Sequence, residues 1–112
     1  MHLVILNFPV SEERMGVKSY LARLSKHNRL FHTMMRKLGV QQTLFDLPHS
    51  SEISRRAVQR CMDCARAGDC ENLLSQKDTL DTPPTYCRNV ALIARLQRLD
   101  KASPELGKAL LN

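Results

Sequence analysis

Four cysteines are the residues of this chain whose type and spacing could do chemistry. They are the only cysteines among 112 residues, and they follow the pattern C-x2-C-x5-C-x16-C. Four thiols that lie close together in sequence, with none elsewhere, indicate one shared site. We therefore predict that one metal centre is bound by Cys61, Cys64, Cys70 and Cys87.

The spacing of the cysteines favours an iron–sulfur cluster over zinc. Structural zinc sites usually have two tight pairs of ligands, whereas this chain has one C-x2-C pair and two single cysteines. A close group of cysteines followed by a distant one is commoner in iron–sulfur proteins, although the x5 gap and Arg88 after the last cysteine differ from the ferredoxin pattern. We expect a [4Fe–4S] cluster, with zinc as the alternative cofactor. Disulfides or free thiols are a third interpretation.

No other group of residues indicates catalysis. The sequence has no Gly-rich phosphate loop, no recognisable Ser/His/Asp grouping and no paired carboxylates on one predicted helix face. A thioredoxin-like role for the C-x2-C pair is disfavoured because no predicted strand precedes it. Histidine ligation is not expected, because no H-x3-H pair exists and four cysteines are already available. We predict that the protein is not an enzyme.

The composition predicts a basic protein outside the membrane. The chain has seventeen Lys and Arg and eleven Asp and Glu, which gives a net charge of +6. Such an excess of positive charge is typical of proteins that bind nucleic acid or an acidic protein. The basic residues form no dense run and aromatic residues are few, so a protein partner is favoured over nucleic acid. No apolar run could span a bilayer, and no secretory signal is recognisable. We expect a cytoplasmic protein, whose thiols stay reduced.

The elements that must position the cysteines are predicted to be helices, which gives an all-α fold. Residues 1–10 form an apolar arm, with a short strand or extended segment at 3–6, that either packs over the core or docks on a partner or a membrane surface. A helical pattern then begins with Ser11 as its cap and ends at Gly39. The polar stretch 25–28 indicates two helices, with Ser25 capping the second, or one kinked helix. A continuous helix with Asn28 at a polar seam position is the alternative. Asn28 in an apolar stripe would suit a homodimer formed through this N-terminal helix.

The cysteines are distributed over the later helices. A short helical turn is predicted at 41–47. The next helix starts at Ser50 or Ser51, carries Cys61 and Cys64 on one side, and ends at Gly68. Asp69 caps a further short helix with Cys70 near its start, and a polar loop leads to a last helix near 86–100 that has Cys87 in its first turn. We therefore predict a small helical bundle with a four-cysteine metal site joining its C-terminal helices.

Three segments resemble an uncharacterised family of small bacterial proteins with four cysteines. They are LGV at 38–40, AVQRCMDCARAGDC at 57–70 and PPTYCRNVALIARL at 83–96. The resemblance covers residues 30–97 and supports treating the four cysteines as one site, but it implies no activity. It divides the chain into an N-terminal arm and added helix at 1–29, a four-cysteine helical domain at 30–100 and a tail at 101–112.

These observations predict a small iron–sulfur protein for electron transfer or for redox or iron sensing. The alternative is a zinc-stabilised binding module. In that interpretation, the basic faces of residues 54–60 and 88–101 would contact nucleic acid or an acidic protein.

Overall fold

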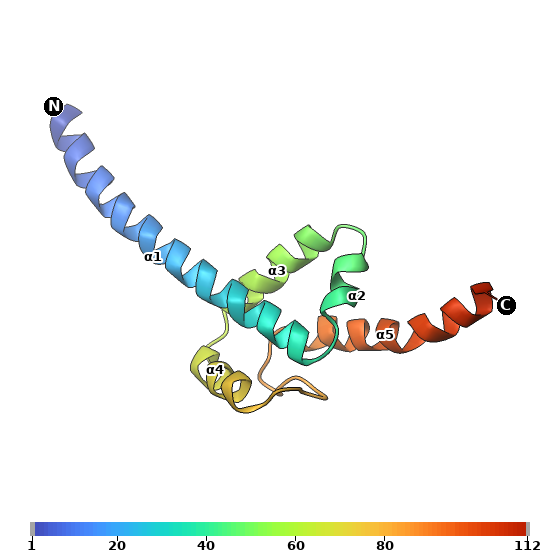
Figure 1. Cartoon of the computed structure of the whole chain (residues 1–112). Helices are drawn as coiled ribbons and strands as arrows, with labels where there is room; N and C mark the ends of the chain where they lie inside the picture. Colours follow the sequence, from blue (N-terminus) through green and yellow to red (C-terminus); the bar gives the residue numbers. More distant parts are fainter. Residues whose placement is uncertain (1, 112) are drawn as a thin grey trace.

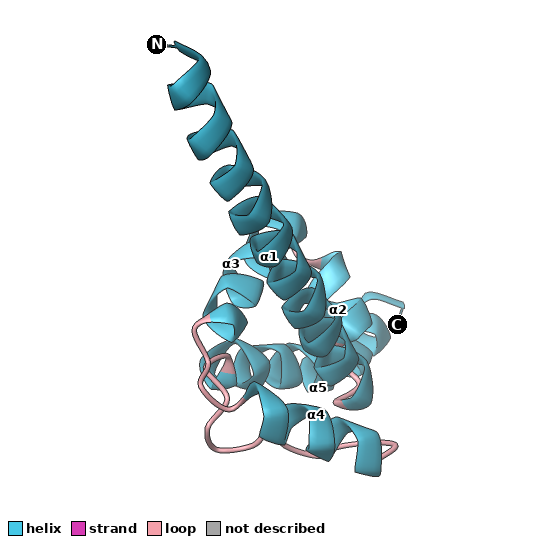
Figure 2. Cartoon of the chain, turned by 90° about the vertical axis from the view of Figure 1, so that its left-hand side faces the viewer, coloured by secondary structure: helices cyan, strands magenta, loops and turns pink. Residues whose placement is uncertain are grey.

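The computed structural model describes the backbone of residues 2–111 and the side chains of residues 16–102. Over this range the chain forms helices and no strands, so the predicted all-α class is confirmed (Figures 1 and 2). The helices are α1 (His2–Lys37), α2 (Gln41–Asp46), α3 (Ser50–Met62), α4 (Ala67–Gln76) and α5 (Val90–Leu111). None of them, within the described residues, is long and apolar enough to cross a membrane.

The N-terminal third is one continuous helix, which corrects three expectations. Residues 3–6 are helical rather than extended, Ser11 lies inside α1 rather than capping it, and no second helix starts at Ser25. A serine favours a helix start only where the preceding residues leave the helix, and here they do not. Whether the side chains of residues 1–10 pack over the core or face a partner lies outside the described residues.

The core is formed where the second half of α1 meets the other helices. Side chains from α1, α2 and α5 that are almost fully buried include Phe31, Met35, Leu44, Ile93 and Leu96. Apolar side chains continue at helical spacing along α1 toward its N-terminus. There the helix extends beyond the bundle, and Val17 and Leu21 are more than half exposed. Only the C-terminal part of the α1 stripe therefore belongs to the core (Figure 1).

The other helices pack around this part of α1. Helices α3 and α4 both contact α1, while α2 contacts α1, α3 and α5. A long loop from 77 to 89 joins α4 to α5 and is anchored on the end of α1: the Leu80 N–H donates to the Lys37 carbonyl at 2.9 Å, and Lys37 Nζ donates to the Lys77 carbonyl at 2.6 Å. Helix α4 and this loop thus lie on one side of α1 (Figure 2).

Three helix boundaries near the cysteines differ from the sequence prediction. Helix α3 ends at Met62, not at Gly68, because Asp63 closes it in a right-handed conformation with its N–H bonded to Gln59 O. Gly68 is the second residue of α4, and Asp69 is the third rather than the cap. Helix α5 begins at Val90, four residues later than predicted, and its backbone continues through the predicted tail to Leu111.

Gly39 ends α1 as predicted, and replacing it tests whether its left-handed backbone conformation requires glycine. Its φ is 74°, which strains residues that have a Cβ, and no atom lies within 4 Å of a Cβ built there. Gly39→Ala should therefore lower the free energy of unfolding by about 1 kcal/mol through conformation alone. The matched control, Gly68→Ala inside α4, should raise it by about 0.5–1 kcal/mol. Urea unfolding followed by circular dichroism measures both, and equal shifts would contradict the explanation.

Candidate metal centre

The four cysteines line one cavity between α1, α3, α4 and the 77–89 loop. Its volume is about 40 Å³, more than the roughly 10–15 Å³ that one water needs. Most of its other lining residues are apolar, and they include Leu30, Phe31, Met34, Pro84 and Ile93. The structure therefore brings the four predicted residues together in a largely apolar enclosure. All four are half-buried free thiols.

Each cysteine comes from a different local structure. Cys61 is in the last turn of α3, and Cys64 lies two residues beyond the end of that helix, where its N–H donates to Cys61 O at 3.0 Å. The prediction that these two share a helix is therefore wrong. Cys70 is in the first turn of α4, as predicted. Cys87 lies in the loop before α5 and not in its first turn, because that helix starts only at Val90.

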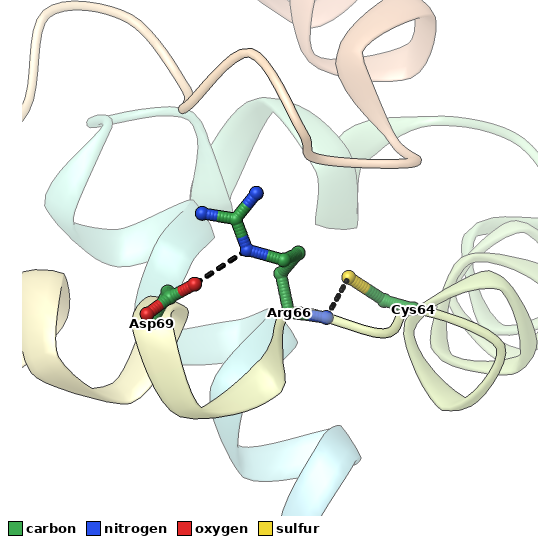
Figure 3. Close-up of polar contacts among 3 residues, drawn as sticks. All are labelled: Cys64, Arg66 and Asp69. Atoms are coloured by element: carbon green, nitrogen blue, oxygen red, sulfur yellow. Dashed lines mark hydrogen bonds and ion pairs between the residues drawn. The ribbon is translucent and has the colours of Figure 1, made fainter.

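Three N–H groups point at the sulfur atoms. The Arg66 backbone N–H donates to Cys64 Sγ at 3.4 Å (Figure 3). The Asn89 backbone N–H donates to Cys87 Sγ at 3.4 Å, and Asn89 Nδ2 donates to Cys61 Sγ at 3.3 Å. A sulfur that accepts hydrogen bonds is stabilised as the anionic thiolate, which is the form that binds metals.

Asn89 holds the cavity together. It is 2% exposed, and besides its two bonds to sulfur its Nδ2 donates to the Ala57 carbonyl at 3.0 Å. Its Oδ1 accepts from Arg60 Nε at 2.7 Å, and its carbonyl accepts the Ile93 N–H at 2.9 Å. The side chain and backbone of Asn89 together thus connect α3, the Cys87 loop and the start of α5. The sequence placed an Asn two residues after the last cysteine, but its partners on α3 depend on tertiary packing.

Three arginines line the cavity or contact residues that line it. The Arg66 guanidinium lies 4.6 Å from the centre of the Tyr86 ring and is paired with the Asp69 carboxylate (Figure 3). This contact joins the start of α4 to the 77–89 loop where Tyr86 lines the cavity. Arg88 also lines the cavity. Arg60 is not a lining residue, but it is connected to the cavity through its hydrogen bond to Asn89.

Burial makes Cys61, Cys70 and Cys87 weaker acids than ordinary thiols in the metal-free protein, because it raises the pKa of each. Burial first, and the neighbouring thiols second, raise the pKa of Cys61 from 9.0 to about 12, and the Asn89 hydrogen bond partly offsets this. Burial and neighbouring charges raise the pKa of Cys70 to about 11, and burial raises the pKa of Cys87. Because folding raises these pKa values, the stability that the neutral thiols contribute is fully present below pH 9 and is lost as the pH rises through the folded values.

Alkylation of the reduced, metal-free protein should reveal these shifts. The thiolate is the reactive form, and a rise of about three pKa units lowers its fraction about a thousandfold at about pH 8. Iodoacetamide should therefore modify Cys61 far more slowly in the folded protein than in urea, with a rate that still increases above about pH 10. Peptide mass spectrometry from neutral to strongly alkaline pH measures each site. Equal rates for folded and unfolded Cys61 at mildly alkaline pH would contradict the assigned burial.

The thiols line the cavity without converging on one point. Among residues 16–102, no three His, Cys, Asp or Glu side chains lie close enough together to hold a single metal ion. The donor set itself fits a metal centre that takes thiolate ligands, since four free thiols and three N–H donors to sulfur face one cavity. The four-cysteine metal site therefore stays a prediction.

His27 is a cavity residue that the sequence did not single out. It is 7% exposed and lines the same cavity as the cysteines. Its Nδ1 lies 2.7 Å from the Arg23 carbonyl, which can only accept, so Nδ1 carries a proton. Its position, three residues before Leu30 and four before Phe31, was a signal that it shares their buried face.

The fold and the cavity define a class: a small all-helical protein in which four free thiols from two helices and the segments that follow them share one enclosure. The chain belongs to a family described as a family of unknown function (DUF6455), whose model matches residues 18–99. The resemblance to an uncharacterised family is thereby confirmed, and the match begins earlier than residue 30. No curated protein and no solved structure matches the chain.

Proposed function

We propose that this protein binds one [4Fe–4S] cluster through Cys61, Cys64, Cys70 and Cys87, and that it serves in electron transfer or in redox or iron sensing. The observation that carries the proposal is the position of the four thiols around one apolar cavity, with N–H donors aimed at three of the sulfurs. When bound, such a cluster supplies a one-electron redox centre whose potential depends on hydrogen bonds to sulfur and on solvent exposure.

The arrangement of the thiols supports a cluster over a single zinc ion. Zinc needs four sulfurs at about 2.3 Å from one atom, whereas a cubane takes one thiolate at each of four iron atoms and suits sulfurs spread around a cavity. Ligation of every iron by cysteine leaves no open position for a substrate, which supports a role without catalysis.

The protein's own residues would hold and shield the cluster. Asn89 fixes Cys61 and Cys87 relative to each other, while the Arg66–Tyr86 contact covers the side where α4 meets the loop. Arg66 and Arg88 place positive charge near thiolates whose negative charge exceeds that of the metal. A compartment that keeps thiols reduced, such as the cytoplasm, is part of the proposal.

Metal analysis of protein purified without air tests the proposal. We expect about four iron and about four sulfide per chain, a brown colour and a broad visible absorption that bleaches on reduction. A matched series should lose the cluster on Cys61→Ser, Cys64→Ser, Cys70→Ser and Cys87→Ser, while Thr79→Ala in the exposed loop keeps it. A colourless protein with one zinc per chain, even after anaerobic reconstitution with iron and sulfide, would reject the cluster and support the zinc-stabilised alternative.

A further inference from the structure

A second concave site lies on another side of α1. It is a groove of about 670 Å³ between α1 and α3, with α2 at one end. Its α1 residues are Leu21, Leu24, Ser25, Asn28 and His32, and the remaining lining residues include Phe45, Ser54, Arg55 and Val58. No cysteine lines it. We call it the α1–α3 groove. It is separate from the cysteine cavity, which is lined by other α1 positions.

The rim of the groove carries large apolar side chains that no part of the described chain covers. Leu21 is 53% exposed and Phe45 is 49% exposed. The stripe continues along α1 toward its N-terminus with Val17 and Tyr20, at helical spacing, and these are 54% and 44% exposed. Contiguous exposed apolar side chains of this size are typical of an interaction surface.

The charged residues at the groove are basic. Arg55 lines it and, among residues 16–102, makes no ion pair, and no Asp or Glu is among the lining residues. Lys18 and Arg29 are exposed on α1, three to four residues from Leu21 and Ser25, and so flank the groove. Within the same range, the buried Nδ1 of His32 has no hydrogen-bond partner. The groove thus offers apolar contacts and uncompensated positive charge.

We infer that the α1–α3 groove binds an acidic amphipathic helix of a partner protein. The apolar face of such a helix would cover Leu21, Leu24 and Phe45, and its carboxylates would pair with Arg55 and the flanking basic residues. A second copy of this chain fits less well, because two copies would bring the same positive charges together in a protein of net charge +6. The inference is independent of the proposed metal cluster.

Selection from a displayed library of helical peptides, with the full chain as bait, tests this inference. We expect enrichment of peptides with leucine or isoleucine at i, i+3, i+4 and i+7, flanked by Asp or Glu. Arg55→Glu and Leu21→Ser should each weaken the binding of a selected peptide by roughly tenfold. Both residues are exposed, so neither change threatens the fold. The matched controls are Arg98→Glu and Leu99→Ser on α5, which should leave binding unchanged.

Other outcomes would overturn the inference. Failure to enrich such peptides, or binding that withstands both groove substitutions, would reject the groove as their site. Self-association in sedimentation equilibrium that disappears on Leu21→Ser would assign the groove to a second copy. Binding of single-stranded RNA or anionic vesicles that is lost on Arg55→Glu but kept on Leu21→Ser would show a purely electrostatic surface.

Discussion

Metal-free protein should keep the core of α1, α3 and α5 rigid, while the segment from 63 to 88 stays folded but opens more often. The core is held by apolar packing around Met35, Ile93 and Leu96, each of which is fully buried. Helix α4 buries little beyond Leu74, and its exposed Lys26–Glu71 ion pair contributes little stability. The proposed metal ligands connect this segment to the core, so their ligation should provide most of its stability.

Hydrogen exchange on the metal-bound and metal-free forms measures this effect. Amides of α4 should exchange roughly a hundredfold faster without metal, since local stability falls by the binding free energy that the metal supplied. Amides near Met35 and Ile93 should keep their protection. Cys70→Ser should reproduce the loosening of α4 in the presence of metal, whereas Thr79→Ala should not. Equal protection of residues 63–88 in both forms would show that the cysteine site does not organise this segment.

Replacement of Asn89 with leucine should destabilise the protein by about 3 kcal/mol, because it removes the hydrogen bonds of the Asn89 side chain to three groups on α3. These groups are the Ala57 carbonyl, Arg60 Nε and Cys61 Sγ. The same change should reduce the iron retained per chain and lower the reduction potential of what remains, since hydrogen bonds to sulfur favour the more negative, reduced state. Denaturant unfolding and anaerobic redox titration give the two quantities.

Two further variants separate the donor role of Asn89 from its size. Asn89→Asp keeps the shape of the side chain and the acceptor for Arg60. It replaces the Nδ2 donor to Cys61 Sγ and the Ala57 carbonyl with an oxygen that cannot donate, so this variant should retain less iron than wild type. Asn72→Leu on the exposed face of α4 is the control, and it should change stability by less than about 0.5 kcal/mol. Iron content of Asn89→Asp equal to wild type would show that the Nδ2 donor is not required.

The sequence predicted the helices well wherever packing and local signals agree. Gly39 ends α1 as expected, because two signals agree. Glycine readily adopts the left-handed conformation that ends a helix, and the apolar residues just before it, such as Met35 and Leu38, are buried in the core. The start of α3 was predicted at Ser50 or Ser51, after Pro48 and with Glu52 in the first turn, and the helix begins at Ser50. In contrast, Ser11 and Ser25 are good caps in isolation, yet α1 runs through both, since a cap stabilises a helix start without forcing one.

The candidate site was predictable in its residues but not in its geometry. The spacing of the cysteines predicted one shared metal site; the structure shows the four cysteines lining one cavity, and the metal itself stays a prediction. The spacing could not place Cys64 outside α3, because the turn at Asp63 depends on how α4 packs against α1. The contacts of Asn89 with Ala57 and Arg60 join positions far apart in sequence, and no local pattern indicates such a pairing.

The positions of the two tyrosines give the protein a built-in optical readout. The chain has no tryptophan. Tyr86 lines the cysteine cavity, and Tyr20 lies beside the α1–α3 groove, where its hydroxyl is 3.4 Å from Gln59 Nε2. A coloured iron–sulfur centre would quench the emission of Tyr86 by energy transfer. In Tyr20→Phe, the remaining fluorescence therefore follows loading of the cavity, and in Tyr86→Phe it follows occupation of the groove, without any added dye.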